Sequence, residues 1–149
     1  MSSERALGLT YVVAAVAVVV GLLAGCPAGG SNGTGGECNY DVECDEGDVC
    51  ARDRTCAPAA SVREVITRWT VGGQPATATT CAPHPDLAIE FVGPALDDAI
   101  GFAPVPCALG QFVVDKLPAR FVEVGLGPEG GPLGRWTIPA TGIVTIDLR

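Results

Sequence analysis

Four cysteines at a constant spacing of six residues place the strongest constraint on how this chain of 149 residues can fold. They are Cys38, Cys44, Cys50 and Cys56. A stretch this short cannot bury enough apolar surface to become ordered, so covalent cross-links must replace a hydrophobic core. We therefore predict a disulfide-rich module over residues 37–58. Three pairings are open, and we favour Cys38 with Cys50 and Cys44 with Cys56, because interleaved bridges constrain one small loop system.

Metal binding is the alternative use of the same module. Structural zinc usually takes cysteine pairs two to four residues apart, which this spacing does not provide. Carboxylates that suit calcium are present at Asp41, Glu43, Asp45 and Asp48. Counted from Asp41, however, Gly47 falls at position seven and Arg52 at position twelve, where an EF-hand needs Gly at six and Glu at twelve. We favour a solvated acidic face, keep calcium as the alternative, and predict no cofactor.

The module also resembles the small four-cysteine knots of extracellular proteins. The resemblance rests on an acid before the second cysteine, on Gly47 in the expected turn, and on Cys56-Ala57-Pro58 at the end. It implies a spacer or a binding knob, and no catalytic role.

An apolar run over residues 7–23 precedes the module. It is longer than the ~7–15 residues of a signal-peptide core and approaches the ~20 that span a bilayer. Composition alone is therefore compatible with either a transmembrane anchor or a cleaved signal helix.

The end of this run, Leu23-Ala24-Gly25-Cys26, resembles the lipobox of bacterial lipoproteins. The resemblance implies that residues 1–25 are a signal peptide, and that Cys26 becomes the N-terminus and carries acyl chains on its thiol and its amine. Two or more chains give stable anchoring. The number of cysteines agrees with lipidation of Cys26, since removing it from the seven leaves an even number that can all form disulfides. We favour this interpretation over a chance thiol below a transmembrane helix.

Residues 26–36 would then be the lipidated cysteine and a Gly-rich tether. Ten flexible residues span roughly 15–20 Å, so the tether lets the rest of the chain stand off the lipid headgroups.

From residue 61 to residue 149, short apolar alternations separated by Gly, Pro and Asp turns predict a mainly β domain. The expected inward-facing positions are Val65, Thr67, Trp69 and Val71; Leu87, Ile89 and Phe91; Val122, Val124 and Leu126; and Val144, Ile146 and Leu148. Further strands are expected at 99–103, 111–115 and 135–138. The number and spacing of these short strands predict a seven-stranded antiparallel β-sandwich. The remaining pair, Cys81 and Cys107, is predicted to form a disulfide that stabilises the domain by roughly 3 kcal/mol.

Residues 112–124 resemble the strand, Leu-Pro turn and strand of transthyretin-like sandwiches, such as the regulatory-like domains that accompany carboxypeptidases. The match centres on Leu117-Pro118, and Arg120 stands where the family usually has glycine. The resemblance implies a fold and an accessory role, but no chemistry.

Composition excludes several functions. Acidic residues outnumber basic ones 17 to 9, so nucleic acid would be repelled. The single histidine, His84, lies between two prolines and is expected in a surface loop. The Asp97-Asp98 pair and the segment 127–132 are both expected in turns. No nucleophile or phosphate-loop motif appears, so we predict no catalytic residue.

These observations together predict a lipid-anchored cell-envelope protein with a binding, adhesion or structural role. The outer membrane or cell surface is favoured, and the inner membrane stays open. The alternative is an envelope hydrolase or accessory subunit with an acidic site at Asp97, Asp98 and Glu129. The expected partner is an envelope or extracellular protein, with a glycan as the alternative ligand. Trp69 and Trp136 belong to predicted strands, and Tyr40 and Phe121 are the only aromatic rings expected to be exposed.

Overall fold

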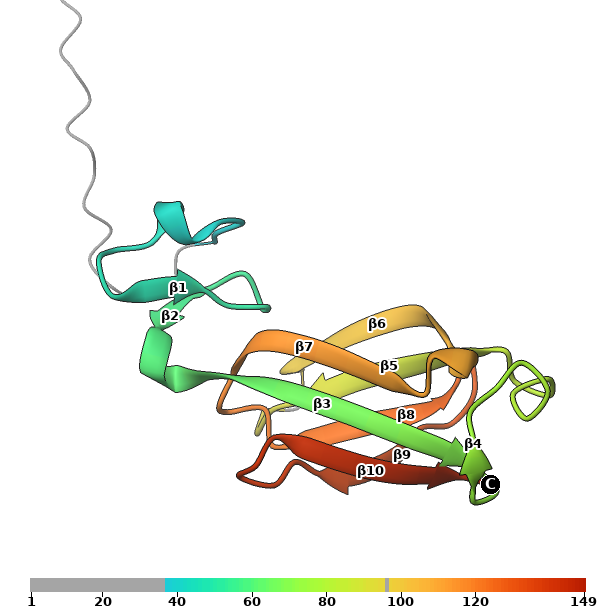
Figure 1. Cartoon of the computed structure of the whole chain (residues 1–149). Coiled ribbons are helices and arrows are strands. Elements are labelled where there is room, and N and C mark those ends of the chain that lie inside the picture. The colour runs from blue at the N-terminus through green and yellow to red at the C-terminus, as the bar shows by residue number, and fades with distance from the viewer. Residues whose placement is uncertain (1–36, 96) are drawn as a thin grey trace, which may run out of the picture. The chain divides into compact units, whose positions relative to one another are not determined.

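The computed structural model describes residues 37–95 and 97–149, which are mainly β (Figure 1). The predicted signal peptide, the predicted lipidation site Cys26 and the predicted tether lie outside these residues. Within the described ranges, no helix has the length and apolar character needed to cross a membrane.

The cysteine module is built on two short antiparallel strands and two disulfides. Its elements are the 3-10 turn η1 (Asp41–Glu43), β1 (Asp48–Cys50), β2 (Cys56–Pro58) and the 3-10 turn η2 (Ala59–Ser61). Cys38 is bonded to Cys50 and Cys44 to Cys56, and each bridge spans 12 residues. Both the predicted disulfides and the favoured pairing are confirmed.

Two four-stranded sheets follow the module. Their strands are β3 (Val62–Val71), β4 (Gln74–Pro75), β5 (Asp86–Val92), β6 (Ala99–Pro106), β7 (Gln111–Pro118), β8 (Glu123–Pro128), β9 (Gly134–Thr137) and β10 (Ile143–Leu148), with a 3-10 turn η3 (Cys107–Leu109) between β6 and β7. One sheet places β10 on one side of β3 and β7 and β4 on the other, and the second runs β6-β5-β8-β9. Each of the seven predicted strand segments is a strand, and β4 is an additional short one.

One pairing differs from the predicted antiparallel arrangement. Strand β10 runs parallel to β3, with Ile143 opposite Ile66 and Leu148 opposite Val71. The alternation of Val144 and Ile146 determines which face of a strand is buried, but it carries no information about which neighbour that strand meets or in which direction it runs.

The core lies between the two sheets, as the alternation predicts. Its largest fully buried side chains include Phe91, Leu87, Ile89, Leu117, Leu126 and Ile146. Trp69 is also buried, and its indole N–H donates to the carbonyl of Cys107 at 2.7 Å. That contact and the confirmed Cys81–Cys107 disulfide join the ends of several strands.

Two predictions in the turn after β7 are wrong. Phe121, expected to be exposed, is fully buried, whereas Val122, expected to face the core, is 46% exposed. The N–H of Phe121 donates to the carbonyl of Pro118 at 3.0 Å, and β8 begins only at Glu123. The turn thus directs the ring inward one residue before the strand alternation starts.

Candidate functional site

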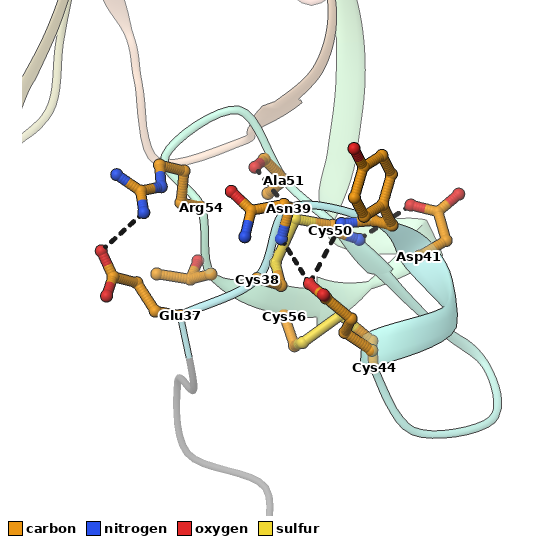
Figure 2. The surroundings of a disulfide bond; sticks show 12 residues. Glu37, Cys38, Asn39, Asp41, Cys44, Cys50, Ala51, Arg54 and Cys56 are labelled. Atoms are coloured by element: carbon orange, nitrogen blue, oxygen red, sulfur yellow. Dashed lines mark hydrogen bonds and ion pairs between the residues drawn. A yellow bond between two sulfur atoms is a disulfide. The ribbon is translucent and has the colours of Figure 1, made fainter.

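The turn η1 of the cysteine module is held by hydrogen bonds to both of its acidic side chains. A carboxylate oxygen of Glu43 accepts the N–H of Asn39 at 2.6 Å and that of Tyr40 at 3.2 Å. The carboxylate of Asp41 accepts the N–H of Cys50 at 3.0 Å, as Figure 2 shows beside the Cys38–Cys50 disulfide. The backbone of this turn is therefore fixed by both carboxylates and by the disulfides on either side of it.

Two apolar side chains of the same turn face solvent. Tyr40 is 70% exposed and Val42 is 91% exposed, the highest value among the exposed large hydrophobic residues. We call residues 40–43 the clamped turn. Because the backbone of this turn is already fixed, less conformational entropy is lost when it binds a partner, which favours association. Over residues 37–58 the module carries seven acidic and two basic residues, a net charge of −5, so a basic surface is its natural complement.

The clamped turn is also tied to the sandwich, through a bulge in β7. Opposite Glu64, the β7 strand has the two residues Asp115 and Lys116 where regular pairing would have one. Lys116 has a φ of 48°, unusual for a residue with a side chain. Bulges redirect side chains, and here the ammonium of Lys116 binds the carboxylate of Asp41 at 2.7 and 2.8 Å.

Three further contacts join the module to the sandwich. The guanidinium of Arg52 pairs with Asp115, and the N–H of Arg52 donates to the carbonyl of Lys116 at 3.1 Å. Arg120 binds Asp53 of the module and also Asp98, at 3.0 Å from its Nε. We call these contacts, with the Lys116–Asp41 pair, the junction.

The contacts of the junction lower the pKa values of three of its carboxyl groups. The hydrogen bond from Lys116, followed by that from the N–H of Cys50, holds the pKa of Asp41 below its ordinary value. The bond from Arg52 lowers the pKa of Asp115. Burial works to raise the pKa of Asp53, but bonds from Arg120 and Thr55 outweigh it, so this pKa is also lowered. The junction therefore favours ionised acids.

The candidate calcium ligands are not gathered into a site. Asp41 and Glu43 are engaged within the clamped turn. In the part of the chain that the structure describes, the one group of three or more potential ligands is the sulfur atoms of Cys38, Cys44 and Cys56, which lie within 4.8 Å of one another. Cys44 and Cys56 are bonded to each other and Cys38 is bonded to Cys50, so all three sulfurs belong to disulfides and none is a thiolate that could ligate a metal.

The alternative acidic site is also not assembled. Asp97 and Asp98 follow the end of β5, where the carbonyl of Asp98 accepts the N–H of Gly93 at 2.7 Å. Glu129 lies at the opposite end, since its N–H donates to the carbonyl of Asp86 at the start of β5. Seven residues of extended strand separate the two ends by roughly 20 Å. These acids therefore cannot act on one substrate bond.

Two smaller expectations are met, and one is met in part. His84 is exposed in the loop between β4 and β5, and Asp97-Asp98 lies in the connection between β5 and β6. The expected turn over residues 127–132 begins later, because Gly127 and Pro128 still belong to β8.

The residues of the junction were not found from the sequence. The partners Arg52 and Asp115 are 63 positions apart, and Arg120 and Asp53 are 67 apart. One signal was present, since Arg120 stands where the transthyretin-like pattern has glycine. Comparisons with protein-family models, curated proteins and solved structures found no match.

Proposed function

We propose that this chain is a lipid-anchored protein of the cell envelope that binds an envelope or extracellular protein through the clamped turn. The observation that carries the binding role is the presentation of Tyr40 and Val42 on a turn whose two acids are both fixed by hydrogen bonds. Aromatic side chains presented on a rigid backbone are typical of the centres of protein interfaces. The acidic module favours a partner whose apolar pocket is rimmed by lysine or arginine.

The pairing of the cysteines supports the anchor. All six cysteines in the described ranges form disulfides, which are typical of oxidising compartments. Of the seven in the sequence, this leaves Cys26, the residue that the lipobox-like motif assigns to lipidation. Of the membranes that could hold such an anchor, we favour the outer membrane or the cell surface.

The sandwich supplies the rigid support in this proposal. Its ion pairs through the junction fix the module that carries the clamped turn. This agrees with the accessory role implied by the resemblance to transthyretin-like domains. A binding, adhesion or structural role is favoured over catalysis because the acids of the alternative site lie at opposite ends of β5.

Mass spectrometry of the protein extracted from membranes tests the anchor. We expect the N-terminal peptide to begin at Cys26 and to carry acyl chains, and we expect Cys26→Ser to leave the chain unacylated. An unmodified N-terminus that begins before Cys26 would overturn the lipid anchor without affecting the binding role.

Affinity capture from envelope extract tests the clamped turn. The bait is residues 37–149, compared with the same fragment carrying Tyr40→Ser and Val42→Ser. Val113→Ser is the matched control, because Val113 is 46% exposed but lies on β7. We expect one protein to be recovered with the unchanged bait and with the control, and lost with the double variant. Equal recovery by all three baits would contradict binding through the clamped turn.

A further inference from the structure

A separate cavity opens at the end of the sandwich where β3, β8 and β10 finish and β5 begins. Its volume is about 210 Å³, and most of its lining is apolar. Leu87, Cys81 and Cys107, all buried, contribute to this lining, together with the partly buried Val71 and Leu148. The Cys81–Cys107 disulfide and the Trp69 bond to the carbonyl of Cys107 hold this wall in place. The cavity is therefore largely preformed.

The size of the cavity limits what can enter it. A dry cavity of roughly 150 Å³ is enough to admit benzene, whereas pockets for drug-sized molecules begin at about 300 Å³. A volume of about 210 Å³ lies between these limits. It suits a single ring with one substituent, or an acyl chain of similar bulk.

The charged groups of the lining determine which substituent fits. No Asp or Glu side chain is among the lining residues, although acids outnumber bases 17 to 9 in the chain. The titratable side chains are those of His84 and Arg149. Three acids, Asp86, Glu129 and Asp147, are adjacent in sequence to lining residues, but none of them belongs to the lining. Asp147 accepts bonds at 2.7 Å from the N–H of Gly73 and from the hydroxyl of Thr70, and these bonds, with the charge of Arg149, lower its pKa. A ligand in the cavity therefore meets a cation and an imidazole, and no carboxylate side chain.

We propose that this cavity binds a small apolar molecule with one anionic group, a single-ring or short-chain carboxylate, with its apolar part against Leu87 and the disulfide and its carboxylate at Arg149 and His84. The site is separate from the clamped turn and does not depend on the identity of a protein partner. No bond is made or broken, because the role is binding alone.

Proton NMR of the full-length chain in phospholipid nanodiscs tests this proposal. His84 is the only histidine in the chain, so its ring Hε1 signal reports on the cavity without ambiguity. Benzoate, benzamide and benzylamine share one ring and differ in the charge of the substituent. We expect benzoate to shift the signal to saturation at low-millimolar concentration, benzamide to bind more weakly, and benzylamine to cause no saturable shift.

Two variants separate charge from shape. Arg149→Gln should weaken benzoate about fivefold or more, as expected for loss of a partly exposed charge-assisted contact, while leaving benzamide unchanged. Arg68→Gln is the matched control, because Arg68 is exposed on β3 outside the cavity, and it should bind benzoate normally. Leu148→Phe fills the cavity and should abolish the saturable response to both probes.

The outcomes that overturn the proposal are equally specific. A shift that grows linearly with benzoate would show that no site is present. Benzylamine binding as tightly as benzoate, or benzoate binding unchanged in Arg149→Gln, would show that the anionic group is not recognised. If Leu148→Phe fails to fold, the Arg149→Gln comparison still decides between these results.

Discussion

Replacing Asp53 by asparagine tests how firmly the cysteine module is held to the sandwich. The Asp53 side chain is only 9% exposed and pairs with Arg120. Its other carboxylate oxygen accepts the N–H of Thr55 at 3.1 Å and the hydroxyl of Thr55 at 2.8 Å. An asparagine oxygen can still accept both bonds from Thr55. The change therefore removes the charge and the acceptor that face Arg120, and preserves the shape of the side chain.

The size of the expected loss follows from this environment. A hydrogen bond to a charged group contributes about 1.5–3 kcal/mol. Part of this is retained, because Asp98 still binds Arg120 after the change. We therefore expect Asp53→Asn to lower the free energy of unfolding by about 1–2 kcal/mol. Asp115→Asn is the matched control. In its pair with Arg52, the side chains are 50% and 51% exposed, so the loss should stay below about 1 kcal/mol.

The pH dependence supplies a second test with a defined sign. The pKa of Asp53 is lower in the folded protein than its ordinary value of 3.8. The folded state therefore binds this proton more weakly than the unfolded state does, so the stabilisation is complete above the ordinary value and is lost as pH falls through the lowered pKa. The difference in stability between wild type and Asp53→Asn should accordingly shrink as the pH is lowered below about 4.

Urea unfolding of residues 37–149, followed by the fluorescence of the buried Trp69 and the partly buried Trp136, measures these differences. A cycle with Arg120→Gln isolates the coupling of Arg120 to Asp53. Equal losses in Asp53→Asn and Asp115→Asn, or a difference from wild type that persists undiminished in acid, would refute the reasoning that burial makes this pair the stronger one.

Three other predictions can be checked by standard measurements. Replacing Cys81 and Cys107 together by alanine removes a bridge that spans 26 residues, which should cost about 3–4 kcal/mol and lower the calorimetric unfolding midpoint by at least about 10 °C; a shift of about 2 °C or less would contradict the role of this disulfide. Phe121→Ala should cost about 3–5 kcal/mol because the ring is fully buried, whereas Val122→Ala should cost less than about 0.5 kcal/mol; similar losses in denaturant unfolding would contradict the observed turn. Calorimetric titration with calcium should give no saturable heat, because Asp41 and Glu43 are engaged internally, and a saturable heat that disappears in Asp45→Asn would restore the calcium site.

Much of the fold was predictable because a strand with one buried face carries that information locally. The alternation at Leu87, Ile89 and Phe91 required no knowledge of the rest of the chain, and each of these residues is buried. The cysteine spacing was similarly local, and the favoured pairing is the observed one.

The failures arise at two irregular points of the chain, a turn and a bulge, where the alternation of a regular strand no longer applies. Phe121 and Val122 are adjacent, and the choice of which one enters the core depends on where the turn after Pro118 ends. Within the junction, the Lys116–Asp41 pair depends on a single extra residue in β7 opposite Glu64, which directs Lys116 toward Asp41. Nothing in the local pattern around Lys116 indicates a partner 75 positions away.

The parallel pair of β3 and β10 has a consequence for the order in which the chain folds. Ile66 is registered with Ile143, so the first long strand of the sandwich finds this neighbour only when the last segment of the chain is present. Contacts of such high contact order slow folding to milliseconds or longer, whereas each disulfide of the cysteine module closes over 12 residues. In the export that we propose for this chain, which would begin with the N-terminus, we therefore expect the module to close first. The sandwich stays open until residues 143–148 have emerged.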